Sequence, residues 1–224
     1  MHDPFYDFFP KREPAPIVAG EVALVTIDLQ YLDAHPDGWV GRVASGAGNP
    51  ELLAPRWKAI DEILPNIARV QDAFRKAGEE LIHVRVAYRT VDGRDGGKAY
   101  MPSADVEPLP RDAKDDEFLP EIAPRENELI FNKTSAGVFN STGIDKVLQR
   151  MGIQHLIMTG IVTDGCVELS SRDAADRGYA VTLVTDGCSA STPEAHDDAL
   201  QRMNDGGFIA LKTSAQIIEE IQAL

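Results

Sequence analysis

The sequence lacks any apolar run that could cross a membrane. None of its stretches approaches the roughly 18 consecutive apolar residues of a transmembrane helix. The N-terminal segment MHDPFYDFFPKREPAP also lacks the basic region and the apolar region that make a signal peptide. We therefore expect a cytoplasmic protein that has no membrane partner.

Positive charge is scarce as well. The 224 residues include 22 Lys and Arg against 36 Asp and Glu, which gives a formal net charge of −14. Nucleic acids and anionic membranes are bound through basic surfaces. The charge balance therefore argues against nucleic acid as a partner and leaves a small molecule as the expected ligand.

Cysteine is limited to Cys166 and Cys188. So few cysteines fit a reducing compartment, and a disulfide between them would add little to the core of a chain this long. Glycine is missing from segment 28–31, which follows the first apolar run. Nucleotide-binding α/β proteins need glycine there for the phosphate loop, so a non-catalytic nucleotide-binding module is disfavoured.

The chain that remains alternates between strand-like and helix-like segments. Short apolar runs rich in β-branched residues predict buried strands, and segments with a period of 3.6 residues predict helices. The predicted strands are 22–29, 81–88, 128–132, 155–159, 180–185 and 209–213. The predicted helices are 53–78, 143–151, 164–177, 193–205 and 214–224. This alternation predicts an α/β fold with three layers, α/β/α, around a central, mostly parallel sheet of Rossmann-like topology.

Three segments lie outside this alternation. Residues 1–20 carry four prolines and an aromatic cluster, and we expect them to form an extended arm ahead of a single domain over 21–224. Residues 30–56 are predicted to be a long connection, and residues 89–127 a polar loop without a clear period. Loops this long are usually functional, so a lid or an oligomer contact is expected at 89–127.

The ends of the predicted strands show where to look for a site. Ligands of parallel α/β sheets bind beyond the carboxyl ends of the strands. The residues found there are Asp28, Tyr88, Arg89, Lys133, the turn 160–166 and the segment 186–189.

The turn that carries Cys166 is the most informative of these. In TGIVTDGCV, residues 159–167, a strand leads through a tight turn directly into a helix. With Thr163 as N-cap, Cys166 lies in the first helical turn, where free N–H groups and the helix dipole favour a thiolate and can hold an oxyanion. The alternative is that Cys166 is a small buried apolar residue. Cys188 has no helix directly after it, and we interpret it as structural.

Asp28 and Lys133 supply what a nucleophilic thiol needs. Asp28 is the acid that ends an otherwise apolar strand, and Lys133 follows the third strand. A catalytic thiol requires a proton acceptor and usually a neighbouring cation. Taken singly, Asp28 reads equally well as a turn residue and Lys133 as a solvated charge. Together with a cysteine at a helix N-terminus, they favour a catalytic site.

Three motifs, in this order along the chain, resemble one known family. They are ALVTIDLQ at 23–30, NKTSAGVF at 132–139 and GIVTDGCV at 160–167, with DGCSA at 186–190 and EAH at 194–196 further on. From about residue 20 onward the chain resembles the isochorismatase-like cysteine hydrolases. That family includes nicotinamidases, N-carbamoylsarcosine amidase, ureidoacrylate amidase and biuret hydrolase, and its members commonly form homodimers or homotetramers.

The resemblance implies a role for individual residues. Cys166 would be the nucleophile, Asp28 the general base, and Lys133 the cation that keeps Asp28 ionised. A cis peptide is implied between Ile161 and Val162. It would aim the backbone N–H of Val162, beside that of Cys166, at the oxyanion of the reaction.

The resemblance also implies the reaction. The thiol attacks a carbonyl carbon, ammonia or another amine leaves, and water hydrolyses the resulting thioester. Members that cleave the vinyl ether of isochorismate lack the cysteine, so Cys166 favours cleavage of a C–N bond in a small amide, carbamoyl or ureido compound. An isochorismatase-type ether hydrolase, a non-catalytic ligand-binding member and a redox-responsive member that has kept Cys166 are the alternatives.

The histidines do not match the metal site of nicotinamidases. Those enzymes carry an Asp-x-His and a further His after the second strand, whereas region 83–92 has only His83, which strand alternation places in the core. His35, His155 and His196 are scattered without ligand spacing. We therefore expect no metal and no other cofactor, and we disfavour a nicotinamidase.

Four residues are expected to touch the substrate. They are Gln30, which follows the catalytic Asp in many members of the family, Tyr88, Arg89 and Phe139. An inward-pointing arginine, Arg85 or Arg89, would suit a carboxylate or a carbamoyl oxygen, and a surface position is the alternative for both. Phe139 and the segment 30–48, with Trp39, are expected to supply an apolar wall.

Overall fold

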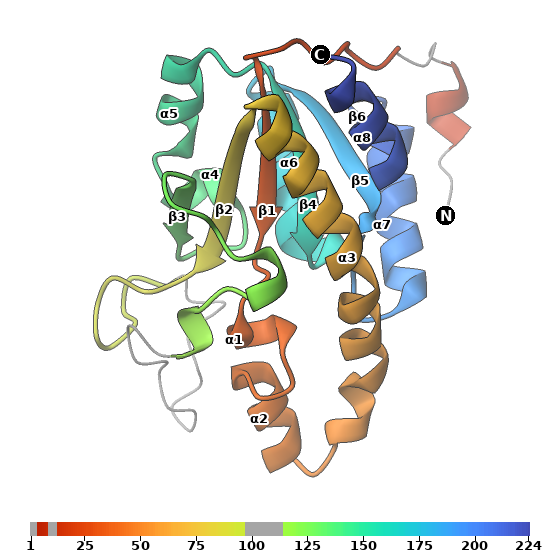
Figure 1. The fold of residues 1–224 in the computed structure, drawn as a ribbon. Coiled ribbons are helices and arrows are strands. Elements are labelled where there is room, and N and C mark those ends of the chain that lie inside the picture. The colour runs from red at the N-terminus through yellow and green to blue at the C-terminus, as the bar shows by residue number, and fades with distance from the viewer. Residues whose placement is uncertain (1–3, 9–12, 97–113) are drawn as a thin grey trace.

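The computed structural model describes residues 4–8, 13–96 and 114–224 of the chain. Its strands form one sheet in the order β3-β2-β1-β4-β5-β6, and every neighbouring pair is parallel (Figure 1). The strands are β1 (Val22–Ile27), β2 (Glu80–Val86), β3 (Leu129–Lys133), β4 (His155–Ile161), β5 (Ala180–Ser189) and β6 (Ile209–Lys212). All six strands were expected from the sequence, and the α/β prediction is confirmed.

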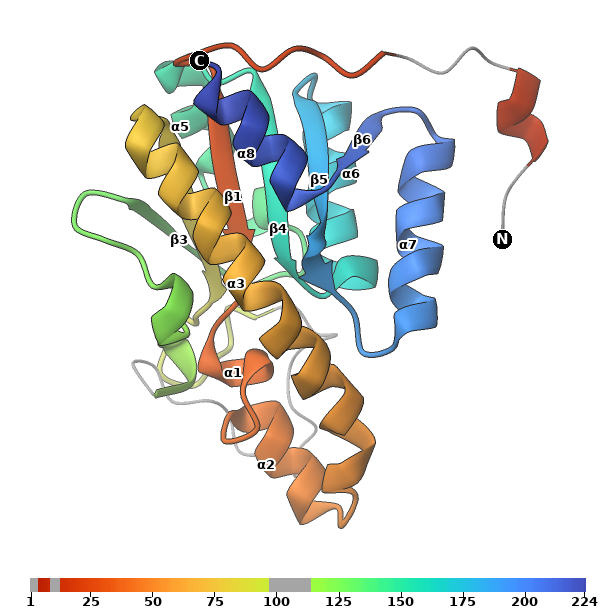
Figure 2. The ribbon, with the colours of Figure 1, turned by 45° about the vertical axis from the view of Figure 1, so that its right-hand side comes forward.

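Helices cover both faces of the sheet and give the three expected layers (Figure 2). On one face, α3 (Ala54–Ala77) and α8 (Ser214–Gln222) pack together over the sheet. The other face carries α4 (Val138–Ser141), α5 (Ile144–Met151), α6 (Glu168–Asp176) and α7 (Pro193–Asp205).

The central strand β1 shows why the sequence folds in this way. Its six residues are all buried, and they alternate between the two cores. Val22 and Leu24 pack against α3 and α8, whereas Ala23, Val25 and Ile27 pack toward the opposite layer. A strand covered on both faces has no solvent side, so its sequence is a continuous apolar run instead of an alternating one.

The topology places a crevice at the carboxyl ends of β1 and β4. From β1 the chain adds β2 and β3 on one side of the sheet, and it then returns to add β4, β5 and β6 on the other side. In doubly wound sheets such a switch point is where ligands bind, because the flanking connections run to opposite faces there. Asp28 follows β1 and Cys166 follows β4, so both lie at this switch point.

One end of α3 extends beyond the sheet and supports the crevice (Figure 1). There Ile60, Ile63 and Ile67 form a separate apolar cluster with Leu29 and Ile122. Two short helices, α1 (Tyr31–Ala34) and α2 (Trp39–Gly46), lie beside this part of α3. They form a wall over the carboxyl edge of β1.

The helices of this wall were not expected from the sequence. The segment 30–56 was predicted to be a connection, but it holds α1, α2 and the 3₁₀ turn η2 (Pro50–Leu53). A helix of four or eight residues spans about one or two turns and leaves too little periodic signal to recognise. Strand β5 is also longer than expected, because it continues to Ser189 and places Cys188 in the strand instead of in a turn.

The two segments expected to be loop and arm are described only in part. Of the predicted loop, residues 97–113 lie outside the described residues, and the turns η3 (Lys114–Asp116) and η4 (Pro120–Ile122) follow them. At the N-terminus, η1 (Pro4–Phe8) exposes its aromatic side chains, and residues 13–20 run past the end of the sheet opposite the crevice. No helix in the described parts of the chain is both long and apolar enough to span a membrane.

Gly160 sets the distance between β1 and β4 beside the crevice. It pairs with Ile27 across the two strands and has a φ of +117°, which side chains rarely tolerate. A Cβ added at Gly160 would also collide with the carbonyl oxygen of Ile27. The close approach of the strands at this pair therefore depends on the absence of a side chain.

We expect Gly160→Ala to lower the free energy of unfolding by about 2–4 kcal/mol, because both the backbone angle and the neighbouring carbonyl oppose a methyl group. Denaturant unfolding monitored by circular dichroism measures the change. Gly143→Ala is the matched control, since a Cβ there meets no atom within 4 Å. Equal stability of the two variants would contradict the proposed role of Gly160.

Candidate active site

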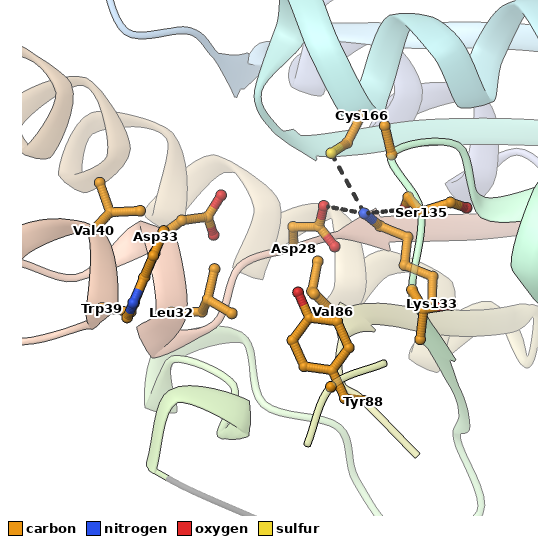
Figure 3. Close-up of a pocket in the computed structure, with 13 residues that line it drawn as sticks. Asp28, Leu32, Asp33, Trp39, Val40, Val86, Tyr88, Lys133, Ser135 and Cys166 are labelled. Carbon is orange, nitrogen blue, oxygen red and sulfur yellow. Dashed lines mark hydrogen bonds and ion pairs between the residues drawn. The ribbon is translucent and has the colours of Figure 1, made fainter. Parts of the chain in front are cut away.

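Three side chains from three strand ends meet at the switch point. Asp28 follows β1 directly, Lys133 is the last residue of β3, and Cys166 lies in the turn after β4. Figure 3 shows the three side chains pointing toward one another at one edge of the sheet. The structure thus brings together the residues that the sequence proposed as nucleophile, base and cation.

Lys133 is the hub of this cluster. Its ammonium lies 2.8 Å from Oδ2 of Asp28, donates to the carbonyl oxygen of Ser135 at 3.0 Å, and lies 3.4 Å from Sγ of Cys166. An ammonium has three N–H donors, and each of these contacts can use one. The side chain is fully buried, so the ammonium makes its contacts with protein groups and not with solvent.

Asp28 is held in an uncommon conformation. Its φ is +57°, a region that non-glycine residues seldom occupy, while its backbone N–H donates to the carbonyl oxygen of Val84 at 2.9 Å. Its carboxyl is fully buried, and Oδ1 accepts no hydrogen bond from the described residues. Oδ1 is therefore available to receive a proton from a neighbouring group, and the Cys166 thiol interacts with this carboxyl.

Cys166 lies in a π-helical turn, η5 (Thr163–Val167), directly before α6. The turn is irregular because Gly165 has φ −131° and ψ −106°. Ser170 fixes it to the rest of the fold, since its hydroxyl donates to the carbonyl oxygen of Cys166 at 2.6 Å and accepts from the N–H of Val138 at 3.1 Å. The sulfur is thereby held at the mouth of the crevice.

The local geometry corrects one expectation and agrees with another. Thr163 is not an N-cap, because its hydroxyl shares a hydrogen bond of 2.8 Å with Nδ1 of His196, and Cys166 precedes α6 instead of lying in its first turn. The peptide between Ile161 and Val162 is cis, as the resemblance implied. The oxyanion role of the N–H groups of Val162 and Cys166 stays a prediction.

The electrostatics of the cluster hold the proton on sulfur. Burial raises the pKa of the Asp28 carboxyl, and the Lys133 ammonium offsets part of this effect. Burial also raises the pKa of the Cys166 thiol, and the charge of Asp28 raises it further, while Lys133 lowers it. The thiolate expected from the sequence is therefore not the resting form. The site instead pairs a thiol with the carboxyl group of Asp28.

Lys133 keeps its charge in this environment. Burial alone would favour the neutral amine, but the charge of Asp28 and the hydrogen bonds to Asp28 and Cys166 outweigh that effect and raise the pKa of Lys133 above its ordinary value. The cluster therefore contains one fixed cation and two groups that can share one proton.

A cavity of about 200 Å³ opens beside these three residues. That volume is below the roughly 300 Å³ at which pockets begin to hold drug-sized ligands, so it suits a compound of few atoms. Besides Asp28, Lys133 and Cys166, the lining consists of Leu32, Asp33, Trp39, Val40, Val86, Tyr88, Gly93, Thr134, Ser135 and Ala136. The apolar wall comes mainly from α1 and α2, which agrees with the expectation for Trp39.

Only one of the four expected substrate contacts lines this cavity, and it is Tyr88. Gln30 is fully buried and ties two segments together, because its amide donates to the carbonyl oxygens of Val86 and Asp115 and its Oε1 accepts from the N–H of Val86. Arg89 is exposed and donates to the carbonyl oxygen of Ser141.

Phe139 and Arg85 also point elsewhere. Phe139 stacks on Tyr179 with ring centroids 6.2 Å apart. Arg85 donates to Asn132 and to the carbonyl oxygen of Asp116. Neither is part of the cavity lining. Arg85 in β2 is half-buried with protein partners and Arg89 after β2 is exposed, so neither lies where it would bind a substrate carboxylate.

Asp33 is the charged residue of the lining that the sequence did not single out. It lies on α1 and faces the cavity from the side opposite Lys133 (Figure 3). Its only sequence signal is an acid five residues after Asp28, and without knowledge of α1 that spacing indicates nothing.

The histidines and other metal-binding side chains are dispersed. His83 is buried in β2 with Nε2 2.9 Å from Glu128, as its predicted core position requires. Within residues 4–8, 13–96 and 114–224, no three His, Cys, Asp or Glu side chains are grouped so that they could hold a metal ion. The expectation of a metal-free site stays a prediction.

The chain is similar to known proteins over most of its length. The sequence model of the isochorismatase domain matches residues 22–216. The ureidoacrylate amidohydrolase RutB of Variovorax paradoxus is 28% identical over 210 residues, which cover 86% of this chain and 76% of that protein. The N-carbamoylsarcosine amidase of an Arthrobacter species is 28% identical over 123 residues, or 54% of this chain and 47% of that protein. A solved cysteine hydrolase from Pseudomonas syringae pv. phaseolicola shares the fold with a TM-score of 0.73 at 24% identity, over 96% of this chain and 99% of that one.

The charge of Asp28 predicts how its removal changes the thiol. In Asp28→Asn the pKa of Cys166 should fall, because the negative charge that disfavours the thiolate is gone and Lys133 remains. Alkylation of Cys166 by iodoacetamide at a fixed pH near 8 should become about tenfold faster, as expected for a shift of about one pKa unit. Peptide mass spectrometry identifies the modified cysteine.

Asp61→Asn serves as the control for this experiment, since Asp61 is an exposed acid on α3. Its alkylation rate should equal that of the parent protein. An unchanged rate in Asp28→Asn would show that Asp28 does not act on the thiol, whereas a slower rate would show that the loss of Asp28 as a base outweighs the loss of its charge.

Proposed function

Because the chain belongs to the isochorismatase family, we propose that it is a cysteine-dependent amidohydrolase. It cleaves a C–N bond of a small amide, carbamoyl or ureido compound through a thioester intermediate. The observation that carries this proposal is the contact among Asp28, Lys133 and Cys166 beside a small cavity. The similarity to two proteins named as an amidohydrolase and an amidase supports the same type of reaction.

The first half of the reaction uses Asp28 as a base. Oδ1 of Asp28 takes the proton of the Cys166 thiol as the sulfur attacks the carbonyl carbon of the substrate. The raised pKa of the thiol delays ionisation until the substrate is in place, and the raised pKa of the carboxyl makes it a stronger base than an exposed aspartate. The oxyanion is held by the N–H groups of Val162 and Cys166.

The second half returns the same proton. Protonated Asp28 donates to the leaving nitrogen, the C–N bond breaks, and ammonia or an amine leaves while the acyl group stays on sulfur as a thioester. A water molecule then attacks the thioester carbonyl and gives a proton to Asp28, which passes it to the departing sulfur. Lys133 keeps Asp28 ionised between these steps, because its ammonium stays charged throughout.

We expect Cys166→Ser to keep the fold and to lose ammonia release from a panel of amide, carbamoyl and ureido compounds by at least about a thousandfold, the usual scale for loss of a nucleophile. Cys188→Ala is the matched control and should keep its activity, because Cys188 is buried in β5 away from the cavity. Parallel measurement of pyruvate release from isochorismate tests the ether-hydrolase alternative. Turnover that survives in Cys166→Ser would rule out the thiol mechanism.

We also expect treatment with a metal chelator to leave ammonia release unchanged. The proposed steps need a base, an acid and an oxyanion site, and the chain supplies all three from its own groups. Activity before and after exhaustive dialysis against chelator is the measurement. Inactivation that zinc or iron reverses would contradict the mechanism.

A further inference from the structure

We propose that Asp33 is a specificity-determining residue, which accepts a hydrogen bond from an N–H group at the end of the substrate away from the scissile carbonyl. The site then selects compounds that carry an N–H donor at that end over compounds that carry a carboxylate there. This inference rests on the proposed function, which says which end of the substrate reacts with Cys166. The recognition of the other end is argued from the residues that line the cavity.

The position of Asp33 gives it access to a bound ligand. Asp33 lies on α1, and its carboxyl points across the cavity toward the space between Asp28 and Cys166 (Figure 3). A compound whose carbonyl carbon lies at the sulfur must extend away from Lys133. Asp33 is the charged group that it meets in that direction among the described residues of the lining.

The hydrogen bonds of Asp33 leave one oxygen open. The buried guanidinium of Arg56, on α3, donates to the backbone oxygen of Asp33 at 3.1 and 2.8 Å and reaches the carboxyl oxygen Oδ2 only at 3.4 Å. Arg56 also donates to the hydroxyl of Ser191 at 2.9 Å. Arg56 therefore holds α1 mainly through the main chain and engages only one side of the carboxyl.

The second carboxyl oxygen, Oδ1, is buried and has no hydrogen-bond partner among the described residues. A buried acceptor left without a partner is unfavourable, and a donor that satisfies it recovers that free energy. An amide, ureido or amino N–H would do so. A carboxylate would instead place a second negative charge against Oδ1.

The charges around the cavity disfavour an anionic ligand for a second reason. Its described lining has two acids, Asp28 and Asp33, and one base, Lys133, whose donors are already used by Asp28, Ser135 and Cys166. No arginine belongs to that described lining. A substrate carboxylate would therefore meet repulsion without a free cation to offset it.

The ionisation of Asp33 fixes the conditions for a test. Burial and the charge of Asp28 raise the pKa of Asp33 to about 7, while Arg56 and Lys133 oppose the rise. Above that pH the side chain is a carboxylate and can only accept hydrogen bonds. Measurements at about pH 8.5 therefore compare ligands against the ionised form.

Iodoacetamide and iodoacetate are a matched pair of probes, because they differ only in an amide against a carboxylate. The measured quantity is the alkylation rate of Cys166 with iodoacetamide divided by its rate with iodoacetate, and this ratio is normalised by the same ratio for glutathione. We expect the normalised ratio to be about ten at pH 8.5. This is the scale of one charge-assisted hydrogen bond. The thiolate fraction of Cys166 affects both reagents equally and cancels from the ratio.

The variant Asp33→Asn should lower this normalised ratio at least about fivefold while Cys166 still reacts with iodoacetamide. Asp37→Asn is the matched control, since Asp37 is exposed nearby and does not line the cavity, and its ratio should not change. A role of Asp33 limited to supporting Arg56 would change the thermal unfolding midpoint but not the ratio. A ratio near one in the parent protein overturns the proposal without any variant.

A second pair separates this inference from the proposed function. Ureidoacetamide and ureidoacetate share one reacting ureido group and differ at the far end, and calorimetry on Cys166→Ser measures their binding without turnover. We expect tighter binding of the amide by about tenfold and loss of that preference when Asp33→Asn is added. Preference for the amide, with no turnover of this pair or of any compound in the panel by the parent protein, would refute the amidohydrolase and keep the role of Asp33. Turnover of both compounds with equal kcat/KM would support the amidohydrolase and refute the role of Asp33.

Discussion

The buried ion pair between Asp28 and Lys133 is the contact on which the site depends. Removing two charges from water is expensive, and such a pair persists only where geometry and further hydrogen bonds compensate. Here the ammonium is 2.8 Å from the carboxylate and uses its other donors on Ser135 and Cys166. Lys133 thereby also contacts the sulfur of Cys166, so this one cation influences both the position and the protonation of the thiol. Loss of either charge would leave the other buried without a partner.

The sheet makes this contact possible because it brings together residues that are far apart in the chain. Asp28 and Lys133 end strands separated only by β2, and Cys166 follows β4 on the other side of β1. The three side chains meet at one edge because all the strands are parallel and end together. Gly160 allows β4 to approach Ile27 closely, and this links the packing of the central strands to the distance between carboxyl and thiol.

Periodicity and composition were sufficient to predict the six strands and the long helices, whereas the meeting of Asp28, Lys133 and Cys166 was predicted from strand-end positions and from the family resemblance. They failed where structure depends on contacts with distant segments. Gln30 and Arg89 have strand-end positions that suit a pocket, yet their partners are backbone groups of Val86, Asp115 and Ser141, which no local pattern reveals. The helices α1 and α2 were missed because each is too short for a periodic signal, and α1 is stabilised by packing on α3. The thiol of Cys166 differs from the expected thiolate because burial and the charge of Asp28 outweigh the favourable effect of Lys133.

Asp28 and Asp33, the two acids of the cavity, carry the same functional group but differ in their neighbouring cations, and this difference suits them to different roles. Each has a basic partner. Lys133 contacts the carboxylate of Asp28 directly at 2.8 Å, whereas Arg56 donates mainly to the backbone oxygen of Asp33 and to the hydroxyl of Ser191. Asp28 therefore has a fixed counter-ion and an open oxygen beside a thiol, which suits repeated exchange of one proton. Asp33 has a weaker counter-ion and an open oxygen at the cavity, which suits a hydrogen bond from a ligand. The charge of Asp28 in turn raises the pKa of Asp33, and a ligand N–H at Asp33 reverses that effect. Occupation of the far end of the cavity is thus coupled to the electrostatics of the reacting end.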